Sequence, residues 1–196
     1  MTLSKRKILV GITISLCSAG TIHPTFADPV TTTSEQVGES KPKHDKWTLF
    51  NSPEKGFKLK YPSDWAEEEF QQGPLVCKFK TLNGLVSARM AVEQLPPGMT
   101  LDQYSTATNQ QVKAFMESEK MPVTIVEESR TVFNTVPACK IVYTFPLADK
   151  PATTKAMQIL AVKNGRGYVF NYTAISDKYD EFLTVINTVV NSIELL

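Results

Sequence analysis

Histidine is the base of most nucleophilic enzymes, and the sequence holds only two histidines. Only His44 follows the N-terminal segment that we expect to be removed, and it precedes the first predicted strand. A Ser/His/Asp or Cys/His site needs a histidine within hydrogen-bond reach of its nucleophile, which makes His44 a poor candidate. The sequence also lacks a GxGxxG or P-loop pattern. We therefore predict no catalytic residue, no cofactor and no enzymatic activity.

Carboxylates gather on both sides of Trp65, at Asp64, Glu67, Glu68 and Glu69. Oxygen ligands of this kind suit hard cations such as calcium. These four residues are therefore weak candidates for a cation site. A charged loop that is simply solvated explains the same pattern, and the spacing of an EF-hand is absent.

Basic residues occupy alternate positions in two predicted strands, at Lys78, Lys80 and Arg89, and Lys140 has a similar setting in a third strand. Adjacent strands would join them into a strip that attracts anions, and Glu93 would share that face. A partly solvated face of a sheet is the alternative.

Two cysteines lie within the predicted domain, Cys77 and Cys139. In an oxidising compartment a pair of cysteines is compatible with a disulfide. Both also lie on the apolar side of a strand-like alternation, and buried free cysteine behaves as a small hydrophobe. Both alternatives stay open at this point.

Short segments of alternating polarity are predicted to position these side chains. The predicted strands are 47–51, 57–61, 75–81, 87–95, 123–133, 138–145, 154–162 and 167–174. Asn83-Gly84 and the residues 163–166 provide hairpin turns. The segment that ends in Pro96-Pro97-Gly98 separates the first four strands from a helix.

Two helices are predicted. The first begins at Thr100 with a capping box to Gln103, and the second has an apolar stripe. The stripe consists of Tyr179, Phe182, Leu183, Ile186, Val189, Val190 and Ile193. Val185 is expected to point away from it, and Ser176 or Asp177 is expected to cap the helix. The fold class is therefore α+β, an antiparallel β-sheet flanked by helices.

The N-terminus has the features of an export signal over residues 1–27. Lys5, Arg6 and Lys7 precede an apolar run that is too short for a membrane span, and Thr25 and Ala27 suit a signal peptidase. We expect cleavage before Asp28. Leu16 before Cys17 argues against a lipoprotein, the other interpretation of this segment, and a retained membrane anchor is a third.

Removal of residues 1–27 lowers the Lys+Arg total from 21 to 18 against 20 acidic residues, which gives a net charge of −2. Such a balance does not favour a nucleic-acid partner. Residues 28–45 are polar and contain two prolines, as in a flexible linker. No transmembrane segment is predicted after cleavage. The predicted domain occupies residues 46–196.

The segment 49–65, with Gly56-Phe57 and Tyr61-Pro62 followed by Trp65, resembles the opening of PsbP-like domains. The segment 167–174 and the helix that ends at Ser192-Ile193 resemble the end of that family. The resemblance implies an α/β/α sandwich and an accessory role, as in the lumenal subunits of photosystem II. The histidines proposed to bind metal in the family have no counterpart here.

These features together predict an exported, non-catalytic accessory or binding protein. Its partner would be a protein or a membrane complex, and it would be related to photosystem II if the source is photosynthetic. The expected location is the periplasm or the medium, or the thylakoid lumen in a photosynthetic source. The alternatives are an extracytoplasmic hydrolase that uses carboxylates and a structural envelope module.

Overall fold

The structure is a computed structural model that describes residues 44–146 and 152–196. The predicted signal peptide and nearly all of the predicted linker lie outside these residues. The helices are α1 (Leu101–Ser118) and α2 (Ser176–Asn191). The strands are β1 (Trp47–Ser52), β2 (Phe57–Pro62), β3 (Ala66–Glu69), β4 (Leu75–Lys80), β5 (Val86–Gln94), β6 (Thr124–Phe133), β7 (Val136–Pro146), β8 (Thr153–Lys163), β9 (Arg166–Ile175) and β10 (Glu194–Leu195).

The strands form two antiparallel sheets. The large sheet has seven strands in the order β3-β4-β5-β9-β8-β7-β6, and the small sheet has the order β1-β2-β10. β4 and β5 form the predicted hairpin, and β6 to β9 form the predicted meander. Asn164 and Gly165 turn between β8 and β9 with φ values of 52° and 70°, as a two-residue hairpin loop requires.

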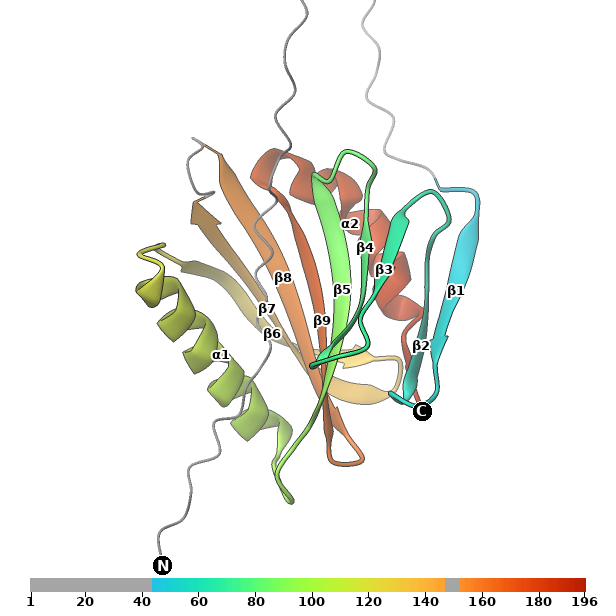
Figure 1. Cartoon of the computed structure of the whole chain (residues 1–196). Helices are drawn as coiled ribbons and strands as arrows, with labels where there is room; N and C mark the ends of the chain where they lie inside the picture. The colour runs from blue at the N-terminus through green and yellow to red at the C-terminus, as the bar shows by residue number, and fades with distance from the viewer. Residues whose placement is uncertain (1–43, 147–151) are drawn as a thin grey trace, which may run out of the picture.

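The domain has three layers (Figure 1). α1 covers one face of the large sheet over β7 and β8, and α2 lies on the opposite face, where it packs against β9, β8 and β5. The small sheet lies beside α2, which it contacts through β2. The predicted α+β class with helices that flank an antiparallel sheet is therefore confirmed.

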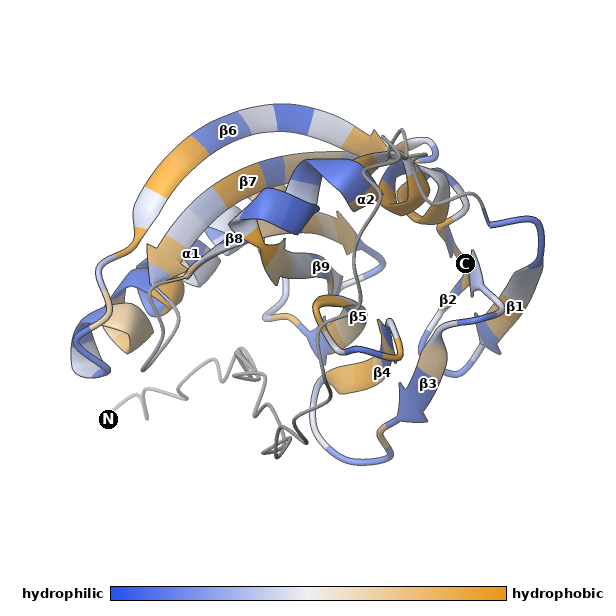
Figure 2. Ribbon diagram, turned by 90° about the horizontal axis from the view of Figure 1, so that it is seen from above, coloured by the Kyte–Doolittle hydropathy of each residue, from blue (hydrophilic) through white to orange (hydrophobic). Residues whose placement is uncertain are grey.

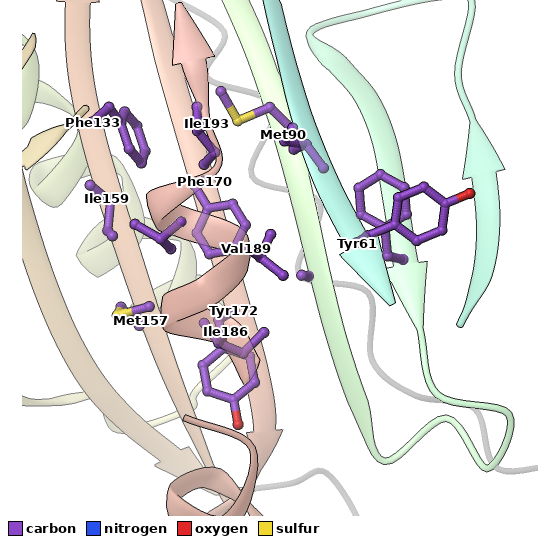
Figure 3. Packing of buried hydrophobic residues seen from close by; sticks show 14 of the residues in the cluster. Tyr61, Met90, Phe133, Met157, Ile159, Phe170, Tyr172, Ile186, Val189 and Ile193 are labelled. Atoms are coloured by element: carbon purple, nitrogen blue, oxygen red, sulfur yellow. The ribbon is translucent and has the colours of Figure 1, made fainter. Parts of the chain in front are cut away.

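The larger hydrophobic core lies between α2, the large sheet and the small sheet. Figure 3 shows Ile186 and Val189 of α2 among Phe170 and Tyr172 of β9. Ile186 and Phe170 are 0% exposed. The predicted apolar stripe of α2 therefore meets the sheet as expected.

Two predictions about α2 are wrong. Val185 is buried at 5% exposure, because α2 packs against β2 as well as the large sheet and its buried arc is wider than the stripe. No side chain caps the helix: the N-cap is Ile175, and the buried Ser176 Oγ has no hydrogen-bond partner in the described part of the chain.

The first helix begins as predicted. Thr100 accepts a hydrogen bond from the Gln103 backbone while the Gln103 side chain accepts one from the Thr100 backbone. Below the helix, Tyr104 lies so close to β9 that a Cβ on Gly167 would be 2.5 Å from the Tyr104 Cζ atom. Glycine at this position sets the distance between helix and sheet.

Two strands were not predicted. β3 contains Glu67, Glu68 and Glu69, which the sequence favoured as a loop, and β10 has only two residues. β3 is an edge strand, so charged side chains on it reach water without breaking the ladder. β10 pairs with β2 only after α2 has returned the chain to it.

Candidate functional site

A row of polar side chains crosses the α1 side of the large sheet and forms the candidate site. Each member lies directly opposite the next on the neighbouring strand. This polar row consists of Glu68, Lys78, Arg89, Asn171 and Gln158. α1 packs mainly over β7 and β8 (Figure 1). Its Tyr104 also reaches Glu93 of β5 and Gly167 of β9, four residues along those strands from Arg89 and Asn171 of the row.

The outer end of the polar row, on β3, β4 and β5, is half-buried and carries positive charge. Lys78 lies opposite Arg89 on the adjacent strand, and Lys80 follows on the same face. The Glu68 carboxylate pairs with Lys80 and, at 3.7 Å, with Lys78. The hydrogen bond from Lys80 lowers the pKa of Glu68. Lys78, Lys80 and Arg89 thus gather positive charge on one face, which favours the approach of an anionic group.

The structure places Lys78, Lys80 and Arg89 on one face of two adjacent strands, as the hypothesis of a basic strip required, and it shows that the inclusion of Lys140 was wrong. Ala138 and Val142, the neighbours of Lys140 on its own face of β7, belong to the core under α2. Lys140 thus lies on the opposite face from the polar row, where its Nζ is 2.6 Å from Glu127 Oε1.

The inner end of the polar row is buried. Gln158 is 2% exposed, and its Oε1 has no hydrogen-bond partner in the described part of the chain. It lines a small hollow under α1 together with Val112 and Tyr143. Burial raises the pKa of Tyr143, and the positive charge of Arg89 opposes that shift.

Glu93 lies on the same face of β5, as predicted, but it serves the packing of α1. The Tyr104 hydroxyl donates to Glu93 Oε1 at 2.5 Å. Burial raises the pKa of Glu93 and the hydrogen bond from Tyr104 lowers it, with burial the larger effect. The charged carboxylate is therefore less stable in the folded protein than in the unfolded chain.

We expect Glu93→Gln to stabilise the domain at pH 7. Below the pKa of the unfolded chain, near 4.5, Glu93 is protonated in both states and its charge costs no stability. Above the raised pKa of the folded protein the carboxylate is charged in both states, and the cost of burying it is then largest. Urea unfolding at pH 4 and pH 7 measures this. The variant should exceed the wild type in stability at pH 7, and the gain should shrink toward pH 4. An equal gain at both pH values would contradict the raised pKa.

Only two of the four acidic candidates share a setting: Glu67 and Glu69 lie on the same face of β3 and line one hollow. Glu67 accepts a hydrogen bond from the Tyr61 hydroxyl, whereas Glu68 points to the other face of β3 and pairs with lysines. Asp64 lies in the turn before β3, and its Oδ1 is 2.9 Å from His44 Nδ1. Successive residues of a strand point to opposite faces, and this alternation separates Glu68 from Glu67 and Glu69. Within residues 44–146 and 152–196, no three His, Cys, Asp or Glu side chains group as a metal site.

Both cysteines are free and buried. Cys77 is on β4 and Cys139 is on β7, with β5, β9 and β8 between them. Four strand spacings amount to about 19 Å, far beyond the Cα separation of a disulfide, which rarely exceeds about 7 Å. Cys77 and Cys139 are therefore buried free cysteines, the second of the two alternatives, and they do not form a disulfide with each other. Burial raises the pKa of the Cys77 thiol, and Arg130 Nη1 donates to Cys139 Sγ at 3.1 Å.

His44 is held against the domain, although the sequence favoured a place in the linker. Besides its contact with Asp64, its ring meets that of Trp65 edge-on, with centroids 6.3 Å apart. Its Nε2 is buried and has no hydrogen-bond partner in the described part of the chain. The geometry gives His44 a packing role against Trp65.

The domain is an α+β sandwich in three layers, with a helix on each face of an antiparallel sheet. Hydrogen-bonding side chains lie on the sheet beside the helix α1. These features define its class. The family model described as PsbP matches residues 46–195. The chain therefore belongs to the PsbP family. No curated protein matches the sequence.

Solved structures share the fold at low sequence identity. Cyanobacterial PsbP (CyanoP) from Synechocystis sp. PCC 6803 is 13% identical with a TM-score of 0.62, over 84% of this chain and 98% of that one. The Saccharomyces cerevisiae Ran-binding protein Mog1p is 8% identical with a TM-score of 0.54, over 76% and 95%. LpqN of Mycobacterium tuberculosis, involved in cell envelope biogenesis, is 12% identical with a TM-score of 0.53, over 77% and 86%.

Proposed function

We propose that this chain is an exported, non-catalytic accessory protein that binds an acidic segment of a partner protein at the polar row. The observation that carries the proposal is the basic end of that row, where Lys78, Lys80 and Arg89 share one face. Charged donors of this kind recognise carboxylates.

Two further observations support a binding role. Membership of the PsbP family favours an accessory subunit, and a photosynthetic source would favour photosystem II and the thylakoid lumen. A protein of the same fold, Mog1p, is named for binding Ran, so the fold is compatible with protein recognition. No helix in the described residues is long and apolar enough to cross a membrane.

Cross-linking in the native extract followed by capture of the full chain tests the proposal. Arg89→Gln should lower partner recovery about tenfold, because a hydrogen bond to a charged group contributes roughly 1.5–3 kcal/mol. The control is Lys60→Gln, which removes one exposed positive charge from β2 of the small sheet. Equal recovery with both variants, or turnover of a substrate by the purified wild type, would refute binding at the polar row.

Export is tested separately by the intact mass of the protein recovered from cells that express the full gene. We expect a chain that starts at Asp28, because Thr25 and Ala27 satisfy the small-residue rule of signal peptidase. A retained N-terminus or a lipid adduct on Cys17 would contradict cleavage at this position.

A further inference from the structure

The outer edge of the large sheet at β6 is long and exposed. In Figure 2, β6 runs along the rim of the domain, and no described element pairs with its outer side. Two of its apolar side chains are well exposed, Val126 at 57% and Val132 at 54%. An edge strand of this length presents a row of backbone donors and acceptors to another strand.

The opposite edge of the sheet is protected. β3 has only four residues, Ala66–Glu69, and three of them are consecutive glutamates. A second copy paired at β3 would bring like charges together, a common device against edge-to-edge association. The two edges of the sheet therefore differ in kind.

The residues of β6 are complementary to themselves when read in the reverse direction. In an antiparallel pair of β6 strands centred on Ser129, each residue lies opposite the residue equally far beyond Ser129 in the second copy. Glu128 then lies opposite Arg130, and Val126 lies opposite Val132. By two-fold symmetry each of these pairs occurs twice.

We propose that two copies of this chain associate through their β6 strands, antiparallel and centred on Ser129, into one continuous sheet. Opposite charges that face each other across two strands stabilise the pairing, and so do pairs of β-branched residues. Charged residues on an edge strand normally oppose pairing with another strand. In β6 the order of Glu128 and Arg130 places opposite charges across the pair, and this attraction favours pairing. This dimer is independent of the polar row and of the partner proposed for it.

The charges also select this register over its neighbours. A shift of the centre by one residue to Glu128 places that carboxylate opposite its own copy. A shift to Arg130 places the guanidinium opposite its own copy. Like charges directly opposite each other destabilise a strand pair, so the register centred on Ser129 is the favoured one.

The geometry of β6 leaves the required side chains within reach. The Arg130 side chain is 64% exposed although it pairs with Asp102. Glu128 makes no ion pair with any described residue. The register of β6 against β7 shifts between Ile125 and Glu127. Val126 is the bulged residue, and a bulge ends regular pairing, so the proposed ladder is regular from Glu127 to Thr131 and the two Val126–Val132 pairs lie at its ends.

Sedimentation analysis of the full chain from micromolar to millimolar concentration tests the proposal with a charge swap. The wild type should dimerise. Arg130→Glu and Glu128→Arg should each weaken the dimer at least about tenfold, since each creates two like-charge pairs. The double variant with both changes should restore the wild-type affinity. Asp102→Asn, which removes the intrachain partner of Arg130, should leave the dimer intact.

A cysteine at the centre tests the register. Ser129→Cys should be joined to its own copy by a short bismaleimide. Thr131→Cys should not, because its copy lies about 13 Å away along the strand, four residues at the rise of a β-strand. A wild type that is monomeric at all concentrations, a dimer insensitive to Arg130→Glu, or equal cross-linking of both cysteines would overturn the proposal. Thermal melts confirm that each variant is folded.

Discussion

Ile186→Asp is expected to remove most of the free energy of unfolding of this domain. Ile186 is 0% exposed on the face of α2 that meets the large sheet. Loss of a buried isoleucine costs roughly 2–5 kcal/mol, and a buried carboxylate without a partner adds to that cost. A total loss of at least about 4 kcal/mol is large against the 5–15 kcal/mol typical of a domain.

Urea unfolding followed by tryptophan fluorescence measures this loss. The matched control is Asn187→Asp, the same new side chain one position further along α2, where the native residue is exposed. The control should stay within about 0.5 kcal/mol of the wild type. Val185→Asp should also be strongly destabilising, since Val185 is buried. If Asn187→Asp proved the more damaging of the two neighbours, the packing of α2 would have to be revised.

Gly167→Ala is expected to destabilise the domain by about 1–3 kcal/mol, the usual cost of one extra methyl group in a packed core. The new Cβ would lie 2.5 Å from Tyr104 Cζ and 2.7 Å from Tyr104 Oη. Tyr104 is 0% exposed and hydrogen-bonded to Glu93, so the ring cannot swing away freely. In a strand position with free space, the same substitution would be mildly stabilising.

A double-mutant cycle separates the clash from other effects. Tyr104→Ala alone should cost about 3–5 kcal/mol through the cavity it leaves. The double variant Tyr104→Ala/Gly167→Ala should be no less stable than Tyr104→Ala, because the added methyl group then has room. Additive losses would show that Gly167 is needed for a reason unrelated to Tyr104.

Much of the secondary structure could be predicted because its signals are local. The capping box at Thr100 and the turn at Asn164-Gly165 each depend on residues close in the chain. The β3 strand was missed because Glu67 to Glu69 lack any apolar alternation, and only pairing with β4 holds them extended. Such a strand has no signal of its own in the sequence.

The candidate site was predicted in part. Lys78 and Arg89 belong to one hairpin, so their alternation and the turn between them place both on one face. Gln158 was missed, because a polar residue in an otherwise apolar strand has no motif. A signal was nonetheless present: an uncharged amide inside the run 154–162 requires a hydrogen-bonding environment if that strand is buried.

The sequence by itself determined both helices, every strand except β3 and β10, the class of fold and the likeness to the PsbP family. Only the tertiary structure decided which side chains share a face. In β7, residues of both parities are buried, for example Cys139 and Ile141 under α1 and Val142 under α2. When a helix covers each side of a strand, apolar alternation no longer distinguishes the sides. Lys140 was therefore placed with Lys78, although the assembled sheet puts them on opposite faces.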